Sequence, residues 1–167
     1  MYAVILAGGR GTRFWPVSRA SRPKQYLDIT GDGSMIAVTG RRLRPLASPE
    51  RTLVLTVADQ VALVRAELPD IPPENIFAEP AGRNTAPSLA VAAAMAARDG
   101  DDPMLCCPAD HLIEKDDRFL ETAVASAEVA ARRDVLVTFG IAPTFAATGY
   151  GYIAVSYTHL RAHETKA

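Results

Sequence analysis

The sequence contains little cysteine and no excess of charge of either sign. Its two cysteines, Cys106 and Cys107, are adjacent. Neighbouring residues on a strand point to opposite faces, which argues against an ordinary disulfide between them and against a CxxC metal or redox motif. Two reduced thiols are typical of a cytoplasmic protein, so we expect that location. Because 18 Lys and Arg residues balance 19 Asp and Glu residues to a net charge of −1, no nucleic acid and no anionic membrane is expected as a partner.

Long apolar segments are also missing. The opening apolar run ends at Gly8-Gly9 and has no basic leader, so no secretory signal is predicted. The longest stretch without Asp, Glu, Lys or Arg is 135–160, and its glycines and hydroxyl side chains indicate strands and turns, not a membrane span. A chain of this length buries roughly 70% of its unfolded surface, so we expect a soluble protein with one core.

Short apolar runs alternate with segments of helical spacing. The runs typical of strands are 2–7, 52–57, 75–78, 104–107, 134–140 and 150–155, and the helical segments are 35–46, 59–68, 85–98 and 116–133. This alternation predicts an α/β fold with a doubly wound, mostly parallel, Rossmann-like sheet and helices on both faces. Ligands of such sheets bind at the carboxyl ends of the strands. The motifs that carry chemistry each follow a predicted strand.

A glycine-rich loop follows the first predicted strand. Its three glycines allow backbone N–H groups to approach phosphate oxygens without a Cβ in the way. Arg13 and Lys24 add positive charge for the same anion. The pattern is neither a P-loop nor a clean GxGxxG motif, because Phe14 takes the place of the last glycine. The candidate nucleotide-binding residues of this region are Leu6, Ala7, Gly8, Gly9, Gly11, Thr12, Arg13 and Lys24.

The stretch LAGGRGTRFWPVSRASRPKQ resembles the signature of the sugar-1-phosphate nucleotidylyltransferases, also called nucleotide-sugar pyrophosphorylases. Trp15-Pro16 with Pro23-Lys24-Gln25 is most similar to the branch of guanylyltransferases that use mannose 1-phosphate. Three later blocks support the resemblance, in the family's order. They are an EPxxRNTAP block at 79–87, a PADH block at 108–111 and a TGYGYI block at 148–153.

The resemblance implies a reaction and a role for each block. GTP and mannose 1-phosphate would give GDP-mannose and pyrophosphate, with Arg13 and Lys24 as catalytic cations. Asp110 would bind Mg²⁺, Gly151 would meet the sugar, and Glu79, Asn84 and Thr85 would join the nucleotide site. The Glu79 carboxylate, which can only accept hydrogen bonds, suits the adjacent N1–H and N2–H₂ donors of guanine.

Other interpretations of these residues stay open. Glu79 could instead be a solvated carboxylate or the ion-pair partner of Arg83. Asn84 and Thr85 could instead cap a helix. Asp110 could instead be a structural residue of a turn. Alternative functions are a nucleotidylyltransferase that uses UTP or ATP with glucose 1-phosphate, or a non-catalytic subunit that binds a nucleotide sugar.

The blocks cover residues 1–155, which we interpret as the N-terminal nucleotide-binding part of a nucleotidyltransferase domain. Residues 156–167 lack periodicity and are expected to be an atypical tail, non-native or disordered. Relatives of this kind carry a later lysine in an EKP-type motif and a second acidic metal ligand, which are missing here. The chain is therefore expected to be a fragment, inactive by itself. The composition leaves assembly into a homo-oligomer open.

Overall fold

The computed structural model describes residues 1–9, 11, 14–80, 85–133, 135–146, 148, 151 and 152. The strands are β1 Tyr2–Leu6, β2 Thr52–Val57, β3 Ile76–Glu79 and β4 Met104–Pro108, and the helices are α1 Met35–Leu43, α2 Val61–Glu67, α3 Thr85–Ala96 and α4 Asp116–Arg133. Two short 3₁₀ turns matter for the site, η2 Lys24–Tyr26 and η4 Ala58–Gln60. The chain divides into two compact units, Met1–Val135 and Leu136–Ala167, and all of these elements belong to the first.

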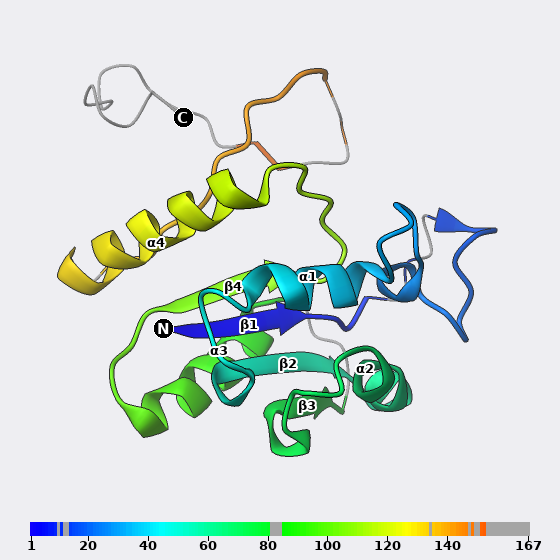
Figure 1. Cartoon of the computed structure of the whole chain (residues 1–167), viewed down its shortest axis with the longest axis horizontal. Helices are drawn as coiled ribbons and strands as arrows, with labels where there is room; N and C mark the ends of the chain where they lie inside the picture. The colour runs from blue at the N-terminus through cyan, green and yellow to red at the C-terminus, as the bar shows by residue number, and fades with distance from the viewer. Residues whose placement is uncertain are drawn as a thin grey trace. The chain divides into compact units, whose positions relative to one another are not determined.

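The four strands form one parallel sheet in the order β3-β2-β1-β4 (Figure 1). From β1 the chain steps outward to β2 and β3, then returns through α3 to β4 on the other side of β1. This reversal creates a topological switch point between β1 and β4, where sheets of this kind bind ligands beyond their carboxyl ends. The last residues of the two strands, Leu6 and Pro108, are paired in register. The glycine-rich loop and the PADH block therefore begin side by side.

Both faces of the sheet are covered by helices, as the alternation of apolar runs predicts. In β1, Ala3 and Ile5 point to the face packed by α1, α2 and α4, while Tyr2 and Val4 point to the face packed by α3. All four side chains are at most 4% exposed. The predicted α/β fold with a parallel, doubly wound sheet is thus confirmed. Among the described residues, no helix combines the length and the apolar character that crossing a membrane requires.

The adjacent cysteines are free thiols on opposite faces of β4, as predicted. Cys107 packs with the α1 side of the core and Cys106 with the α3 side. Burial, which disfavours the charged thiolate, raises the pKa of each thiol to about 11. Both thiols therefore stay protonated at neutral pH and behave as small apolar side chains.

The predicted strand at 134–140 is wrong for the described residues 135–140, which form no helix or strand. The large apolar side chains of these residues are exposed, from 39% for Val137 to completely for Leu136. A strand needs a neighbouring strand for its backbone hydrogen bonds, and no described residue supplies one here. Of the strand predicted at 150–155, only 151 and 152 are described, and they carry no regular structure. The tail predicted at 156–167 lies outside the described residues.

Candidate active site at the carboxyl ends of β1 and β4

The loop after β1 is held by side chains that bind its carbonyl groups. The carbonyl oxygen of Ala7 accepts hydrogen bonds from Thr56 Oγ1 and Gln25 Nε2, both at 3.1 Å. The carbonyl oxygen of Gly9 accepts from Gln25 Nε2 at 2.8 Å and from Gln60 Nε2 at 3.3 Å. Gln25 and Gln60 are each 3% exposed and are also bonded to each other, at 2.8 Å. The carbonyl groups on both sides of Gly8 therefore face the protein interior.

The opposite side of this loop is open. The C=O of Ala7 and the N–H of Gly8 belong to one trans peptide, in which the two groups point in opposite directions. Because the C=O faces Gln25, the N–H of Gly8 points away from it. Within the described part of the chain, no residue accepts a hydrogen bond from the N–H of Gly8 or Gly9. A Cβ built on Gly9 would meet no atom of the described residues within 4 Å, its two neighbours in the chain apart. The loop thus offers unused donors next to free space, which is what an anion requires.

Gly11 adopts a backbone conformation that other residues avoid. Its φ is +62°, and Ser18 Oγ donates to its carbonyl oxygen at 2.6 Å. A Cβ at this position would lie 2.8 Å from the backbone nitrogen of Lys24. Glycine is therefore needed here for two reasons, the left-handed φ and the close approach of η2.

We expect Gly11→Ala to destabilise the fold by about 2–4 kcal/mol, because the strain of a left-handed alanine adds to a backbone clash. Gly31→Ala is the matched control, since Gly31 has a φ of +88° but no atom within 4 Å of a built Cβ. Strain alone should cost the control about 1–2 kcal/mol. Chemical denaturation of both variants measures the difference, and equal losses would show that the contact with Lys24 is not tight.

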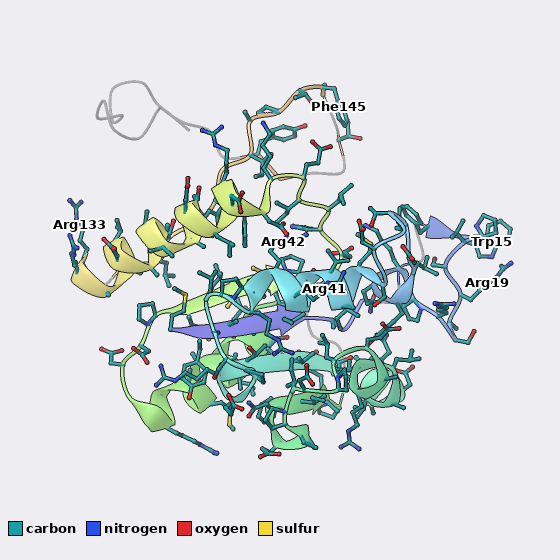
Figure 2. The ribbon with its side chains drawn as sticks, viewed as in Figure 1. Trp15, Arg19, Arg41, Arg42, Arg133 and Phe145 are labelled. Atoms are coloured by element: carbon teal, nitrogen blue, oxygen red, sulfur yellow. The ribbon has the colours of Figure 1, made fainter. Side chains whose placement is uncertain are left out.

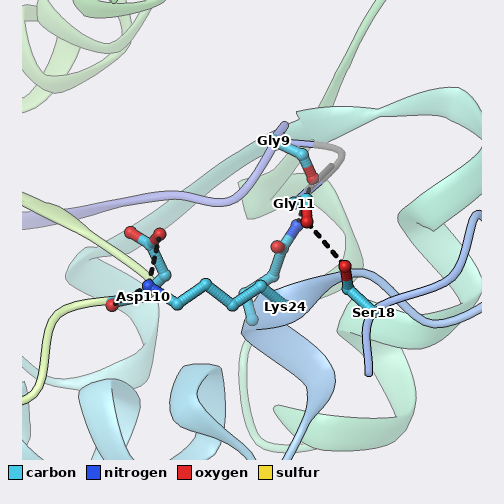
Figure 3. A network of polar contacts seen from close by, with 6 residues as sticks. Gly9, Gly11, Ser18, Lys24 and Asp110 are labelled. Atoms are coloured by element: carbon cyan, nitrogen blue, oxygen red, sulfur yellow. Dashed lines mark hydrogen bonds and ion pairs between the residues drawn. The ribbon is translucent and has the colours of Figure 1, made fainter. Parts of the chain in front are cut away.

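Lys24 and Asp110 form an ion pair across the switch point. The ammonium of Lys24 extends from η2 to lie 3.3 Å from Asp110 Oδ2 and 3.3 Å from the Asp110 carbonyl oxygen (Figure 3). The two side chains are 25% and 43% exposed, so both remain accessible to a ligand. Asp110 follows β4 by two residues. One cation and one carboxylate thus lie at the place where the loop after β1 and the end of β4 meet.

Two aromatic side chains of the segment after the glycine-rich loop lie against cations. The ammonium of Lys24 lies 5.2 Å from the centre of the Phe14 ring, and Arg19 lies 5.8 Å from the centre of the Trp15 ring. Figure 2 shows Trp15 and Arg19 together at the outer edge of this segment. Contact between a cation and an aromatic face is favourable, which helps to hold the Lys24 head in place.

The EPxxRNTAP block lies two strands away from the glycine-rich loop. Glu79 ends β3, and its carboxylate accepts a hydrogen bond from Ser88 Oγ of α3. Thr85 is exposed and is the first residue of α3. Neighbouring strands are about 4.8 Å apart, so the end of β3 lies on the order of 10 Å from the end of β1 along this edge. The helix-start position predicted for Thr85 is confirmed.

The remaining predicted site residues are described in part. Thr12, Arg13 and Asn84 lie outside the described residues. Gly151 belongs to the second unit and is exposed there. Sequence reasoning missed Thr56 and Gln60, which hold the loop from the end of β2 and the turn after it. Their position directly at the carboxyl end of a predicted strand was the one available signal, because that edge of the sheet carries the site.

Asp110 is the residue predicted to bind a divalent cation, and its side chain is 43% exposed at the end of β4. The described residues contain no cluster of three or more His, Cys, Asp or Glu that could enclose a metal. A bound ion would therefore take most of its ligands from elsewhere. Mg²⁺ fits this arrangement, because it binds through one or two carboxylates together with phosphate and water oxygens.

Comparisons with known proteins agree with this geometry. Residues 2–164 match the family described as Nucleotidyl transferase. The chain is 46% identical over 159 residues to a mannose-1-phosphate guanylyltransferase from Salmonella muenchen and 45% identical over 152 residues to the xanthan biosynthesis protein XanB from Xanthomonas campestris pv. campestris. Each match covers 90% of this chain and 32% of the relative.

A solved structure is similar as well. It is described as a mannose-1-phosphate geranyltransferase from Thermus thermophilus, with a TM-score of 0.72 and 38% sequence identity over 77% of this chain and 38% of that one. The chain spans about a third of the length of the curated relatives it matches. The family match covers nearly all of this chain, and the glycine-rich loop lies beside the Lys24–Asp110 ion pair. The chain therefore belongs to the nucleotidyl transferase family.

Proposed function

We propose that residues 1–155 form the N-terminal nucleotide-binding part of a mannose-1-phosphate guanylyltransferase. The full-length enzyme would convert GTP and α-mannose 1-phosphate to GDP-mannose and pyrophosphate. The observation that carries the proposal is the Lys24–Asp110 ion pair, 3.3 Å between charged atoms, beside the open glycine-rich loop. A polyphosphate bound there would meet backbone N–H donors on one side and a cation on the other.

The chemistry asks little covalent work of the protein. A phosphate oxygen of mannose 1-phosphate attacks the α-phosphorus of GTP in line, the new O–P bond forms, and the bond to pyrophosphate breaks. The attacking oxygen is already an anion, so no general base is needed. The barrier is mainly that of bringing two anions together, which the loop N–H groups, Lys24 and Arg13 would lower by neutralising charge on the phosphates.

Asp110 is the residue that would hold Mg²⁺. When bound with the nucleotide, this ion would neutralise negative charge on the phosphate oxygens. The Lys24 ammonium now beside the Asp110 carboxylate would then be free to turn toward the triphosphate. The same cation would serve the carboxylate in the free protein and the phosphates in the nucleotide complex.

Glu79 is proposed to read the guanine edge. The separation between the ends of β3 and β1, on the order of 10 Å, suits a nucleotide that lies along the edge of the sheet with its base at β3 and its phosphates at β1 and β4. The hydrogen bond from Ser88 fixes the direction of the carboxylate. A carboxylate can accept from the N1–H and N2–H₂ groups of guanine, whereas adenine has no such pair of donors.

Competition among nucleotides tests this proposal. We expect the chain, with Mg²⁺ present, to bind GTP at least about tenfold more tightly than ATP or UTP, a difference of ~1.4 kcal/mol. Glu79→Gln should reduce that preference, because an amide presents one acceptor instead of two. Ser88→Ala is a companion variant that keeps the carboxylate but removes its hydrogen bond. Equal affinity for all three nucleotides would contradict the role of Glu79, and a preference for UTP or ATP would favour a sister enzyme.

A further inference from the structure

Gln25 lies in the motif that the sequence analysis singled out, yet the proposed reaction gives it no task. Its side chain is 3% exposed and points away from Lys24, toward the loop after β1. Its amide nitrogen lies 3.1 Å from the carbonyl oxygen of Ala7, 2.8 Å from that of Gly9 and 2.8 Å from the side-chain oxygen of Gln60, so its two N–H groups are shared among three acceptors. A buried amide that donates to one loop and to a second buried amide is placed to hold that loop in position.

Gln60 completes this support from the other side. It accepts from Gln25 at 2.8 Å and itself donates to the carbonyl oxygen of Gly9 at 3.3 Å. The two glutamines come from different turns, η2 and η4, which follow different parts of the sheet. Together with Thr56, they supply four donor contacts to the two carbonyl groups that flank Gly8.

These donors decide which way the peptide groups of the loop face. A carbonyl held toward the interior forces the N–H of the same peptide to face outward, because the two groups of a trans peptide are antiparallel. Without the amide donors, the carbonyl of Ala7 would keep only its contact with Thr56, so it would turn outward more easily, and a carbonyl oxygen repels a phosphate. Orientation of the loop, in addition to its glycine content, thus sets how well it binds an anion.

The geometry points to Gln25, assisted by Gln60, as a positioning residue that holds the start of the glycine-rich loop so that the N–H of Gly8 faces the polyphosphate. This inference rests on the proposed function, since it assumes that the loop binds the phosphates of a nucleotide. It assigns no contact between either glutamine and the ligand. Its ligand class is a polyphosphate, free or as part of a nucleoside triphosphate.

Binding of three probes by the whole chain tests the inference. Gln25→Met keeps the size of the side chain and removes the amide. We expect its affinity for GTP and for inorganic tripolyphosphate to fall at least about tenfold, while affinity for guanosine stays within about twofold, because only the phosphate end of the site depends on the loop. Gln60→Met should lose less, since it gives up one longer contact to the loop. Hydrogen exchange at the amides of residues 7–9 should become faster in Gln25→Met.

Asn75 offers a matched control. Its Nδ2 donates to the carbonyl oxygens of Glu50 and Pro49, at 2.8 Å and 3.4 Å, at the amino end of the sheet. Asn75→Leu should leave all three affinities unchanged.

Three results would overturn the positioning role. They are unchanged affinity of Gln25→Met for tripolyphosphate, an equal loss for guanosine, and an equal loss in Asn75→Leu. If Gln25→Met fails to fold, the loss expected for Gln60→Met carries the test, and an unchanged Gln60→Met overturns the role. If the unaltered chain binds neither GTP nor tripolyphosphate, the proposed function itself fails, and the inference fails with it.

Discussion

Replacing Lys24 by alanine is expected to lower the turnover of the full-length enzyme by at least about tenfold, equivalent to ~1.4 kcal/mol of transition-state stabilisation. The substitution removes the Lys24 ammonium from the switch point. The carboxylate of Asp110 then lacks the ionic partner that lies 3.3 Å away in the unaltered protein. That uncompensated negative charge would then repel the incoming phosphates. Steady-state release of pyrophosphate measures the effect, and Arg13→Ala is expected to lower turnover similarly.

The control for Lys24→Ala lies at the opposite end of the same sheet. Arg51 and Asp102 form an ion pair of 2.5 Å just before β2 and β4, with both side chains about as exposed as Asp110. Arg51→Ala therefore removes a comparable cation from a place where no nucleotide is proposed. We expect its turnover to be unchanged apart from any loss of folded protein, which thermal unfolding reports. Near-normal turnover of Lys24→Ala would remove Lys24 from the charge-neutralising role.

Asp110→Asn is expected to raise the Mg²⁺ concentration needed for half-maximal turnover by at least about tenfold. The variant keeps the size of the side chain but loses the negative charge, and a neutral amide is a much weaker ligand for a hard cation. The carbonyl oxygen of Asp110 still accepts from Lys24 in the variant, so the lysine keeps one of its two contacts. The measured change therefore reflects the carboxylate more than a displaced lysine.

A magnesium titration of Asp110→Asn beside Asp102→Asn provides the comparison. Asp102 also pairs with a cation, but at the amino end of the sheet, so its variant should follow the magnesium curve of the unaltered enzyme. Titration of magnesium-dependent GTP binding gives a second readout that does not require turnover. A magnesium curve unaffected by Asp110→Asn would refute the assignment of Asp110 as the ligand.

The fold could be predicted from the sequence because each strand of the sheet is a distinct apolar run. Strand β2 begins and ends where the pattern of Thr52–Val57 indicates, and α4 spans the predicted 116–133. Residues 135–140 carry an equally apolar pattern but form no strand, because pairing depends on a neighbour and not on the run itself. Local pattern shows that a segment can be a strand, and only the rest of the fold decides whether it is one.

The candidate site was predictable where chemistry is carried by residues that follow strands. Lys24 and Asp110 were expected to serve the same phosphates, and they are in contact although 86 residues separate them. The sequence could not indicate that they contact each other, since that depends on where η2 packs after the loop. For a related reason, Gln60 carried no signal in the sequence beyond its place after a predicted strand. A glutamine at the start of a helical segment has no distinctive spacing, and its partner on Gly9 is a main-chain atom.

Lys24 and Gln25 are consecutive residues of one short turn, yet the first points to the end of β4 and the second to the loop after β1. A substitution at either position that shifts the backbone of this turn would therefore disturb both contacts. Mutational libraries aimed at changing the accepted nucleotide should accordingly treat these two positions as one unit.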